Sequence, residues 1–196
     1  MDQMRTNRAF ALAASMNLHR QVESSGAPAI TLNAAIAMTL QDSGSDEDTI
    51  VAGIIFDLLN QQHGLTPEVI KRDCSAKVLA IAQEFVIEHP SYVPGEDYPS
   101  WRQIQEIRIS RIHDMSPEAQ QIMAAAELHH VLNYLERFER FGQKTAEGLP
   151  HSLEDLIWYY ERLETVLRLG HYGIVTSRVG ELLTVLRAAL RLTETT

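Results

Sequence analysis

Apolar residues recur at intervals of three and four positions along nearly the whole chain, and glycine, proline and serine separate the segments. This spacing places apolar side chains on one face of a helix, whereas the side chains of a strand alternate every second residue. β-branched residues within 50–55 leave a strand there as an alternative, but the acidic residues 46–48 are typical of a helix start. The pattern therefore predicts an all-α protein of about eight or nine helices. The expected helices cover 5–23, 30–42, 47–61, 67–88 with a break near Cys74, a segment beginning at Trp101, 117–140, 153–168 and 175–193.

The sequence gives no sign of a boundary between domains. Its 196 residues are enough for one well-filled core, and it contains no repeat, low-complexity tract or linker. Prolines and a glycine within 89–100 predict a loop, and 141–151 is expected to be a polar connection. We therefore expect a single domain over residues 1–196, with its core in about 5–140 and its C-terminal helices in about 152–193.

Composition and charge exclude several classes of partner. The net charge is −9, so the chain lacks the broad basic surface that nucleic-acid binding needs. No apolar stretch approaches the roughly 20 residues of a membrane span, and the N-terminus lacks the apolar segment of a signal peptide. Cys74 is the only cysteine, which suits a reducing compartment, and no base stands near it in the sequence to activate its thiol. We expect a cytoplasmic protein with an unreactive cysteine and with no nucleic-acid or membrane partner.

One carboxylate, Asp57, interrupts an apolar run over residues 50–59. An ionised carboxylate in apolar surroundings costs several kcal/mol or more, so such groups are paired, bound to a metal or protonated. Asp57 is therefore the first residue for which the sequence demands a partner.

Four short stretches follow one another in an order that is typical of a known family. Residues 21–32 read QVESSGAPAITL, and residues 48–57 read DTIVAGIIFD. Residues 116–119 read SPEA and are followed by AAAELHH at 124–130, and a later helix carries WYY at 158–160. Together they resemble the HD superfamily of metal-dependent phosphohydrolases, and in particular its RelA/SpoT-type branch, which hydrolyses ppGpp and similar nucleotides. The resemblance covers nearly the whole chain and implies an all-α HD-like fold and a bacterial origin.

The resemblance also implies where a metal would bind. In the family, a divalent metal such as Mn²⁺ is held by a histidine of the first motif, the His-Asp pair and an aspartate of the late motif. These positions fall on Leu32, Phe56, Asp57 and Ala126, so only Asp57 keeps a metal ligand. Because one carboxylate cannot hold a catalytic metal, we expect no metal cofactor and no catalytic residue, with Asp57 as a vestige.

Other positions that carry charged or aromatic residues in the family have also lost them. The acidic pair that follows the His-Asp motif falls on Asn60 and Gln61, and the cations near the nucleotide fall on Glu23 and Ser24. The stacking tyrosine falls on Ala29. The resemblance therefore implies a catalytically inactive HD protein that acts as a binding or regulatory module for an unknown small molecule or protein.

Two alternatives remain open at this stage. A rebuilt site, with His63, His129 or His130 joining Asp57, would make the chain a divergent metal-dependent phosphohydrolase acting on a nucleotide or other phosphate ester. His129 and His130 are adjacent and point about 100° apart on a helix, so they do not easily share one ion. If a shrunken pocket remains, Asp57, Asn60 and His129 are expected to line it.

The second alternative is a helix-mediated protein interaction module, with a homodimer as one form. Its surface would be formed by the last two helices, although apolar residues at helical spacing are more often core. The residues concerned are Leu163, Val166, Leu182, Leu183, Val185 and Leu186.

Two further motifs have ordinary interpretations. His113-Asp114 is a literal HD dipeptide, but it stands beside Ser116-Pro117 and is expected to be a solvated helix end. Trp101-Arg102, with Arg108 and Arg111, forms a short basic stretch that is expected to be a solvated face paired with acidic residues.

Overall fold

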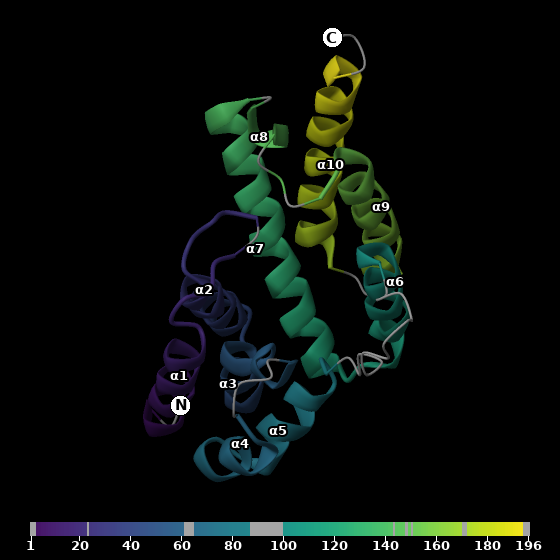
Figure 1. Ribbon diagram of the computed structural model, residues 1–196. Helices are drawn as coiled ribbons and strands as arrows, with labels where there is room; N and C mark the ends of the chain where they lie inside the picture. Colours follow the sequence, from purple (N-terminus) through teal and green to yellow (C-terminus); the bar gives the residue numbers. More distant parts are fainter. Residues whose placement is uncertain are drawn as a thin grey trace, which may run out of the picture. The chain divides into compact units, whose positions relative to one another are not determined.

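A computed structural model gives the fold as all helical, with ten α-helices and two short 3₁₀ helices in the described part of the chain (Figure 1). It describes residues 3–22, 24–60, 65–86, 100–142, 144–147, 149, 151–169 and 172–193. The predicted all-α class is confirmed. The alternative of a strand within 50–55 is wrong, because this segment is the buried part of a helix.

The helices follow the predicted segments closely. Their bounds are α1 Gln3–Met16, α2 Ala29–Asp42, α3 Glu47–Ile55, η1 Leu58–Asn60, α4 Pro67–Asp73, α5 Ala76–Gln83, α6 Trp101–Arg111, η2 Ile112–Asp114, α7 Pro117–Phe141, α8 Lys144–Glu147, α9 Leu153–Leu169 and α10 Gly173–Thr193. The predicted break near Cys74 separates α4 from α5. The predicted helices over 5–23, 47–61 and 67–88 are too long, because α1 ends at Met16, α3 at Ile55 and α5 at Gln83. The short helix α8 was expected to be part of a connection. Most of the expected loop over 89–100 lies outside the described residues.

Side-chain caps explain several helix starts. The carboxylate of Asp46 accepts the backbone N–H of Thr49 over 2.8 Å and begins α3, as its acidic first turn predicts. Ser152 accepts the N–H of Asp155 over 3.1 Å and begins α9. Thr66 stands at the N-cap of α4, but its side chain makes no capping hydrogen bond there.

The chain divides into two compact units. Unit 1 comprises Met1–Val22, Gly26–Glu88 and Met115–His129, and unit 2 comprises Glu23–Ser25, His89–Asp114 and His130–Thr196. The sequence did not predict this grouping, and the single domain over residues 1–196 remains a prediction.

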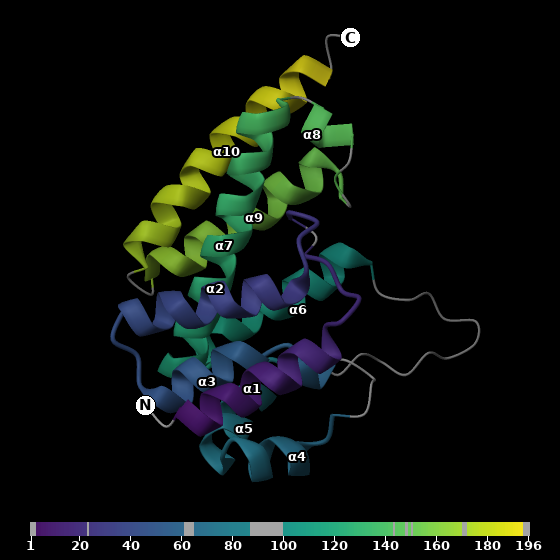
Figure 2. The same cartoon turned by 90° about the vertical axis from the view of Figure 1, so that its left-hand side faces the viewer.

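Unit 1 is built around α3, which packs against α1, α2 and α5 (Figure 1, Figure 2). Every residue of α3 from Thr49 to Ile55 is buried. Leu40 of α2 and Ile122 of α7 belong to the same apolar core. Burial on all sides explains why α3 is almost entirely apolar between its acidic first turn and its end.

In unit 2, α9 packs against α10 and also against α6. Leu163, Leu182, Leu183 and Leu186 are buried in this unit, which confirms the ordinary interpretation for these four core residues. The other two residues of that predicted surface, Val166 and Val185, are half-buried. None of the described helices is long and apolar enough to cross a membrane.

Candidate functional site

The loop between α1 and α2 holds Arg20 in place. The backbone N–H of Ala29 donates to the carbonyl of Arg20 over 2.9 Å, and that of Val22 donates to the carbonyl of Ala27 over 2.8 Å. Gly26 lies between these contacts with φ +73°, a left-handed conformation that glycine adopts without a steric penalty. The first motif therefore forms a closed turn that positions the arginine before it.

Asp57 is paired with this arginine. Arg20 Nη1 lies 2.9 Å from Asp57 Oδ2 and also donates to Asn17 Oδ1 over 2.9 Å. The amide of Asn17 donates in turn to Asn33 Oδ1 over 3.1 Å. The expected non-metal partner of Asp57 is thus present. The expected position within a buried helix is wrong: α3 ends at Ile55, and the Asp57 side chain is 28% exposed.

Apolar packing surrounds the other three positions at which the resemblance requires metal ligands. The ring of Phe56 meets that of Phe85 edge-on, with centroids 5.2 Å apart and an interplanar angle of 76°. Leu32 and Phe56 pack against the core of unit 1, and Ala126 is part of that core with only 5% exposure. Complete burial of a Leu or Phe side chain contributes about 1.5–3 kcal/mol, so the partly buried Leu32 and Phe56 contribute less than that.

The other residues of the predicted pocket, His129 and Asn60, and the rebuilt-site candidate His130 have separate surroundings. His129 Nε2 lies 2.8 Å from Thr39 Oγ1 in unit 1. His130 Nδ1 lies 3.0 Å from Ser24 Oγ in unit 2. The two histidines therefore have different partners, as their 100° separation on α7 predicts. Asn60 ends η1, and its side chain lies outside the described part.

A model of the HD domain family matches residues 9–115. The match covers more than half of the 196 residues and includes the positions of Leu32, Phe56 and Asp57. The chain belongs to the HD domain family. This finding confirms the resemblance indicated by the four motifs, although the match ends before Ala126.

Two solved structures share this HD fold at low sequence identity. One is described as "a metazoan ortholog of SpoT" that "hydrolyzes ppGpp and plays a role in starvation responses"; it is 12% identical, with a TM-score of 0.67 over 93% of this chain and 95% of its own. The other is lmo0812 from Listeria monocytogenes EGD-e, 14% identical, with a TM-score of 0.66 over 78% of this chain and 99% of its own. A comparison with curated protein sequences found no match. The likeness establishes a shared fold with the protein described as an ortholog of SpoT.

The donor set at the HD metal position does not fit a divalent cation. Leu32, Phe56 and Ala126 offer no lone pair, and the guanidinium of Arg20 already neutralises Asp57. Within the described ranges, no three His, Cys, Asp or Glu side chains are grouped so that they could hold a metal ion. Three positions considered above, Glu23, Gln61 and His63, lie outside these ranges.

Ser24, to which the resemblance assigns a basic side chain of the family, is a buried serine. Ser24 is fully buried, and its hydroxyl accepts from Asn133 Nδ2 over 3.2 Å beside His130. Arg137 donates to the carbonyl of Ser24 over 3.3 Å. A serine next to a histidine can form a nucleophile and its base, but no substrate can reach a fully buried hydroxyl. These contacts anchor the loop segment to α7.

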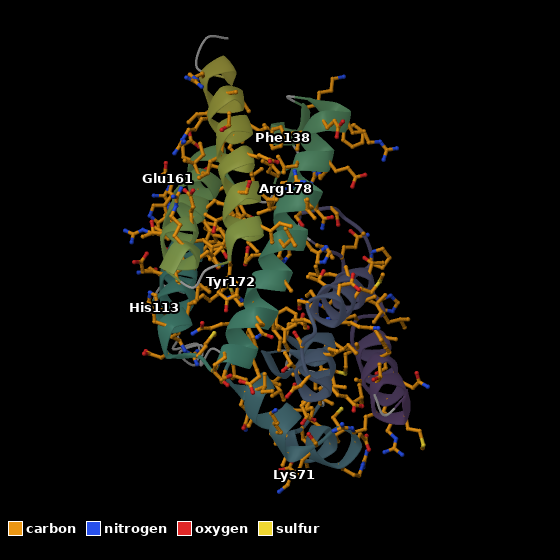
Figure 3. All side chains as sticks on the ribbon, turned by 180° about the vertical axis from the view of Figure 1, so that it is seen from behind. Lys71, His113, Phe138, Glu161, Tyr172 and Arg178 are labelled. Carbon is orange, nitrogen blue, oxygen red and sulfur yellow. The ribbon has the colours of Figure 1, made fainter. Side chains whose placement is uncertain are left out.

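The literal HD dipeptide lies at an exposed helix end. His113 and Asp114 end η2, and both are exposed, so the expected solvated helix end is confirmed (Figure 3). The sequence letters match the family's name by coincidence.

In the basic stretch that follows Trp101, the expected acidic partner is found for Arg102, and Arg102 and Arg108 are exposed. Arg102 forms an ion pair with Asp155 of α9. Glu106 pairs with Arg162 over 3.1 Å rather than with an arginine of its own helix. These pairs connect α6 to α9 within unit 2.

Cys74 is expected to react slowly with thiol reagents. Its burial, and secondly the charge of Asp73, raise the pKa of the thiol from 9.0 to about 11. The thiolate is the reactive form of cysteine. Because the pKa is raised from 9.0 to about 11, the thiolate fraction at pH 8 is about a hundredfold lower than for an unshifted thiol. The rate of disulfide exchange with a chromogenic reagent at pH 8 should be at least a hundredfold lower in the native than in the denatured chain, and should rise towards pH 11. Equal rates in the two states would contradict this prediction.

Proposed function

We propose that this protein is a catalytically inactive HD-family member that acts as a binding or regulatory module. The observation that carries the proposal is at the former His-Asp pair. The position of the histidine is taken by Phe56, whose ring packs against Phe85, and the aspartate is paired with Arg20.

Electrostatics supports the same conclusion. Hydrolysis in this superfamily depends on a metal that acidifies a bound water and neutralises phosphate oxygens. A cation bound at Asp57 would lie beside the guanidinium of Arg20, which is 2.9 Å from the same carboxylate. Like charges at such separations repel each other by several kcal/mol near a protein surface. Asp57 would therefore have to give up its arginine before it could accept a metal.

The nucleotide-binding positions support a change of ligand as well. Ser24 and Ala29 are buried at the positions of a family cation and a stacking tyrosine. A buried hydroxyl and a methyl group provide neither charge for phosphate nor a ring for a base. We therefore propose a small molecule or a protein as the partner, and not a metal-bound nucleotide.

Metal analysis and a hydrolysis screen test this proposal. Protein purified without chelator should contain only substoichiometric Mn, Fe, Zn or Mg. With Mn²⁺ added, ppGpp and other nucleotides should be hydrolysed no faster by the wild type than by Asp57→Ala. The matched control is Asp42→Ala, which removes an exposed carboxylate at the end of α2. A stoichiometric metal and a turnover that are lost in Asp57→Ala and kept in Asp42→Ala would instead establish a divergent phosphohydrolase.

A further inference from the structure

Unit 2 contains a groove of about 770 Å³ between two long helices. One wall comes from α7, from Leu132 to Gly142, and the other from α10, from Arg178 to Ala189. Figure 3 labels Phe138 and Arg178, which line it from the two sides. At 1.5 Å per residue, each wall is about 15 Å long, which equals about three helical turns.

The floor of the groove is apolar and accessible. Leu132 is 36% exposed, and Leu135 and Val185 are half-buried. Ala188 is exposed, so the α10 wall is low and allows another backbone to approach closely. Ile174 precedes Arg178 by one turn on the same face of α10 and is 68% exposed, which extends the apolar strip.

The rim of the groove is acidic. Glu136 and Glu139 line it from α7, and Glu181 lines it from α10. Arg178 is the one cation among the described residues that line the groove, and it is paired with Glu181 over 2.7 Å. Among the residues that the structure describes, Glu136 and Glu139 have no ion-pair partner. An occupant of this groove would therefore face two uncompensated negative charges.

We infer that this groove binds a basic amphipathic helix of a partner protein. Helices dock in such grooves through apolar anchors spaced at i, i+3 or i+4 and i+7, and a three-turn groove accommodates such a set. Lysine or arginine beside the anchors would meet Glu136 and Glu139. A second copy of this chain is a poorer occupant, because each copy has a net charge of −9. The inference rests on the proposed role as a binding module, but the groove shares no residue with the former metal site.

Three labelled peptides of roughly 18 residues, about five helical turns, provide the probe. They share a leucine face and differ only in the polar face, which is lysine-rich, glutamine-rich or glutamate-rich. In fluorescence anisotropy with the full chain, the basic peptide should bind saturably, and its affinity should fall as the salt concentration rises. The glutamine peptide should bind at least tenfold more weakly, and the glutamate peptide should not bind.

Two variants test whether binding occurs in the groove. Ala188→Arg fills it from an exposed helical position, and Glu136→Lys/Glu139→Lys reverses its rim. Each should weaken binding of the basic peptide at least tenfold, and the rim variant should gain affinity for the acidic peptide. The control Asp42→Lys/Asp114→Lys makes the same change in net charge at exposed sites outside the groove and should change affinity less than twofold. Circular dichroism confirms that each variant is folded.

Several results would overturn the inference. These are no saturable binding of the basic peptide, equal affinity for all three peptides, or unchanged affinity in Ala188→Arg. Self-association in light scattering that Ala188→Arg abolishes would identify a second copy as the occupant instead. Metal analysis depends on Asp57 and peptide binding depends on α7 and α10, so failure of one proposal is distinguishable from failure of the other.

Discussion

The variant Leu32→His/Phe56→His/Ala126→Asp is expected to unfold at a lower temperature than the wild type in chelator, and to regain stability when Mn²⁺ is added. It restores the donor set that the HD-family resemblance assigns to these positions. Ala126 is only 5% exposed, so an aspartate there has no water to compensate its charge. Leaving such a group unpaired costs several kcal/mol. The two histidines also give up apolar packing against the core.

The expected shifts in the unfolding midpoint, in chelator and with Mn²⁺, follow from the changes in stability. A loss of about 3 kcal/mol lowers the unfolding midpoint by roughly 10 °C in a chain of this length. A metal at a concentration a hundredfold above its dissociation constant stabilises the folded variant by about 2.7 kcal/mol. We therefore expect Mn²⁺ to raise the midpoint of the triple variant by roughly 5–10 °C and to leave the wild type unchanged. Differential scanning calorimetry with and without Mn²⁺ makes the comparison.

A matched control moves the carboxylate off the site. Ala124 is 4% exposed on the same helix, and its side chain points about 160° away from that of Ala126. The variant Leu32→His/Phe56→His/Ala124→Asp should therefore lose as much stability in chelator and recover none of it with Mn²⁺. If the Ala126→Asp variant folds and Mn²⁺ does not raise its midpoint, the assignment of the lost ligands is wrong.

The fold could be predicted almost entirely from local signals. Periodicity and caps fix where most helices begin, as the Asp46 cap of α3 illustrates. Their ends are less certain, because α3 stops at Ile55 although the apolar run continues. The grouping of helices depends on contacts between distant segments, so the assignment of α6 and of α7 beyond His129 to unit 2 has no sequence signal.

The candidate site could be located but not described from the sequence. The family motifs indicate Asp57 and three further positions, and the structure places Ala126 in the core of unit 1 and Leu32 and Phe56 against it. The partner of Asp57 could not be found in the same way, because Arg20 lies 37 residues away and is positioned by a loop. The edge-on contact of Phe56 with Phe85 also joins two segments that no spacing relates.

Substitution of Gly53 by valine is expected to destabilise unit 1 by about 2 kcal/mol or more. A Cβ built on Gly53 would lie 2.5 Å from Leu40 Cδ1 and 3.1 Å from Ile36 Cγ2, both in the buried contact of α2 with α3. Real Cβ atoms are not found at the shorter of these distances, so α2 or its side chains must move. Glycine within a helix normally costs about 1 kcal/mol relative to alanine, so its replacement regains part of this free energy. That gain offsets only part of the cost of overpacking.

Gly180 provides the matched control, because it is also a helix-interior glycine but has open space around a built Cβ. Gly180→Ala should stabilise the protein by about 0.5–1 kcal/mol, and Gly53→Ala should gain nothing or lose stability. Urea unfolding followed by circular dichroism measures all three variants. Shortening the obstructing side chain in Gly53→Ala/Leu40→Val should give a coupling energy of about 1 kcal/mol in a double-mutant cycle. Additive effects of these two substitutions would mean that close packing of α2 on α3 is not the reason for a glycine at this position.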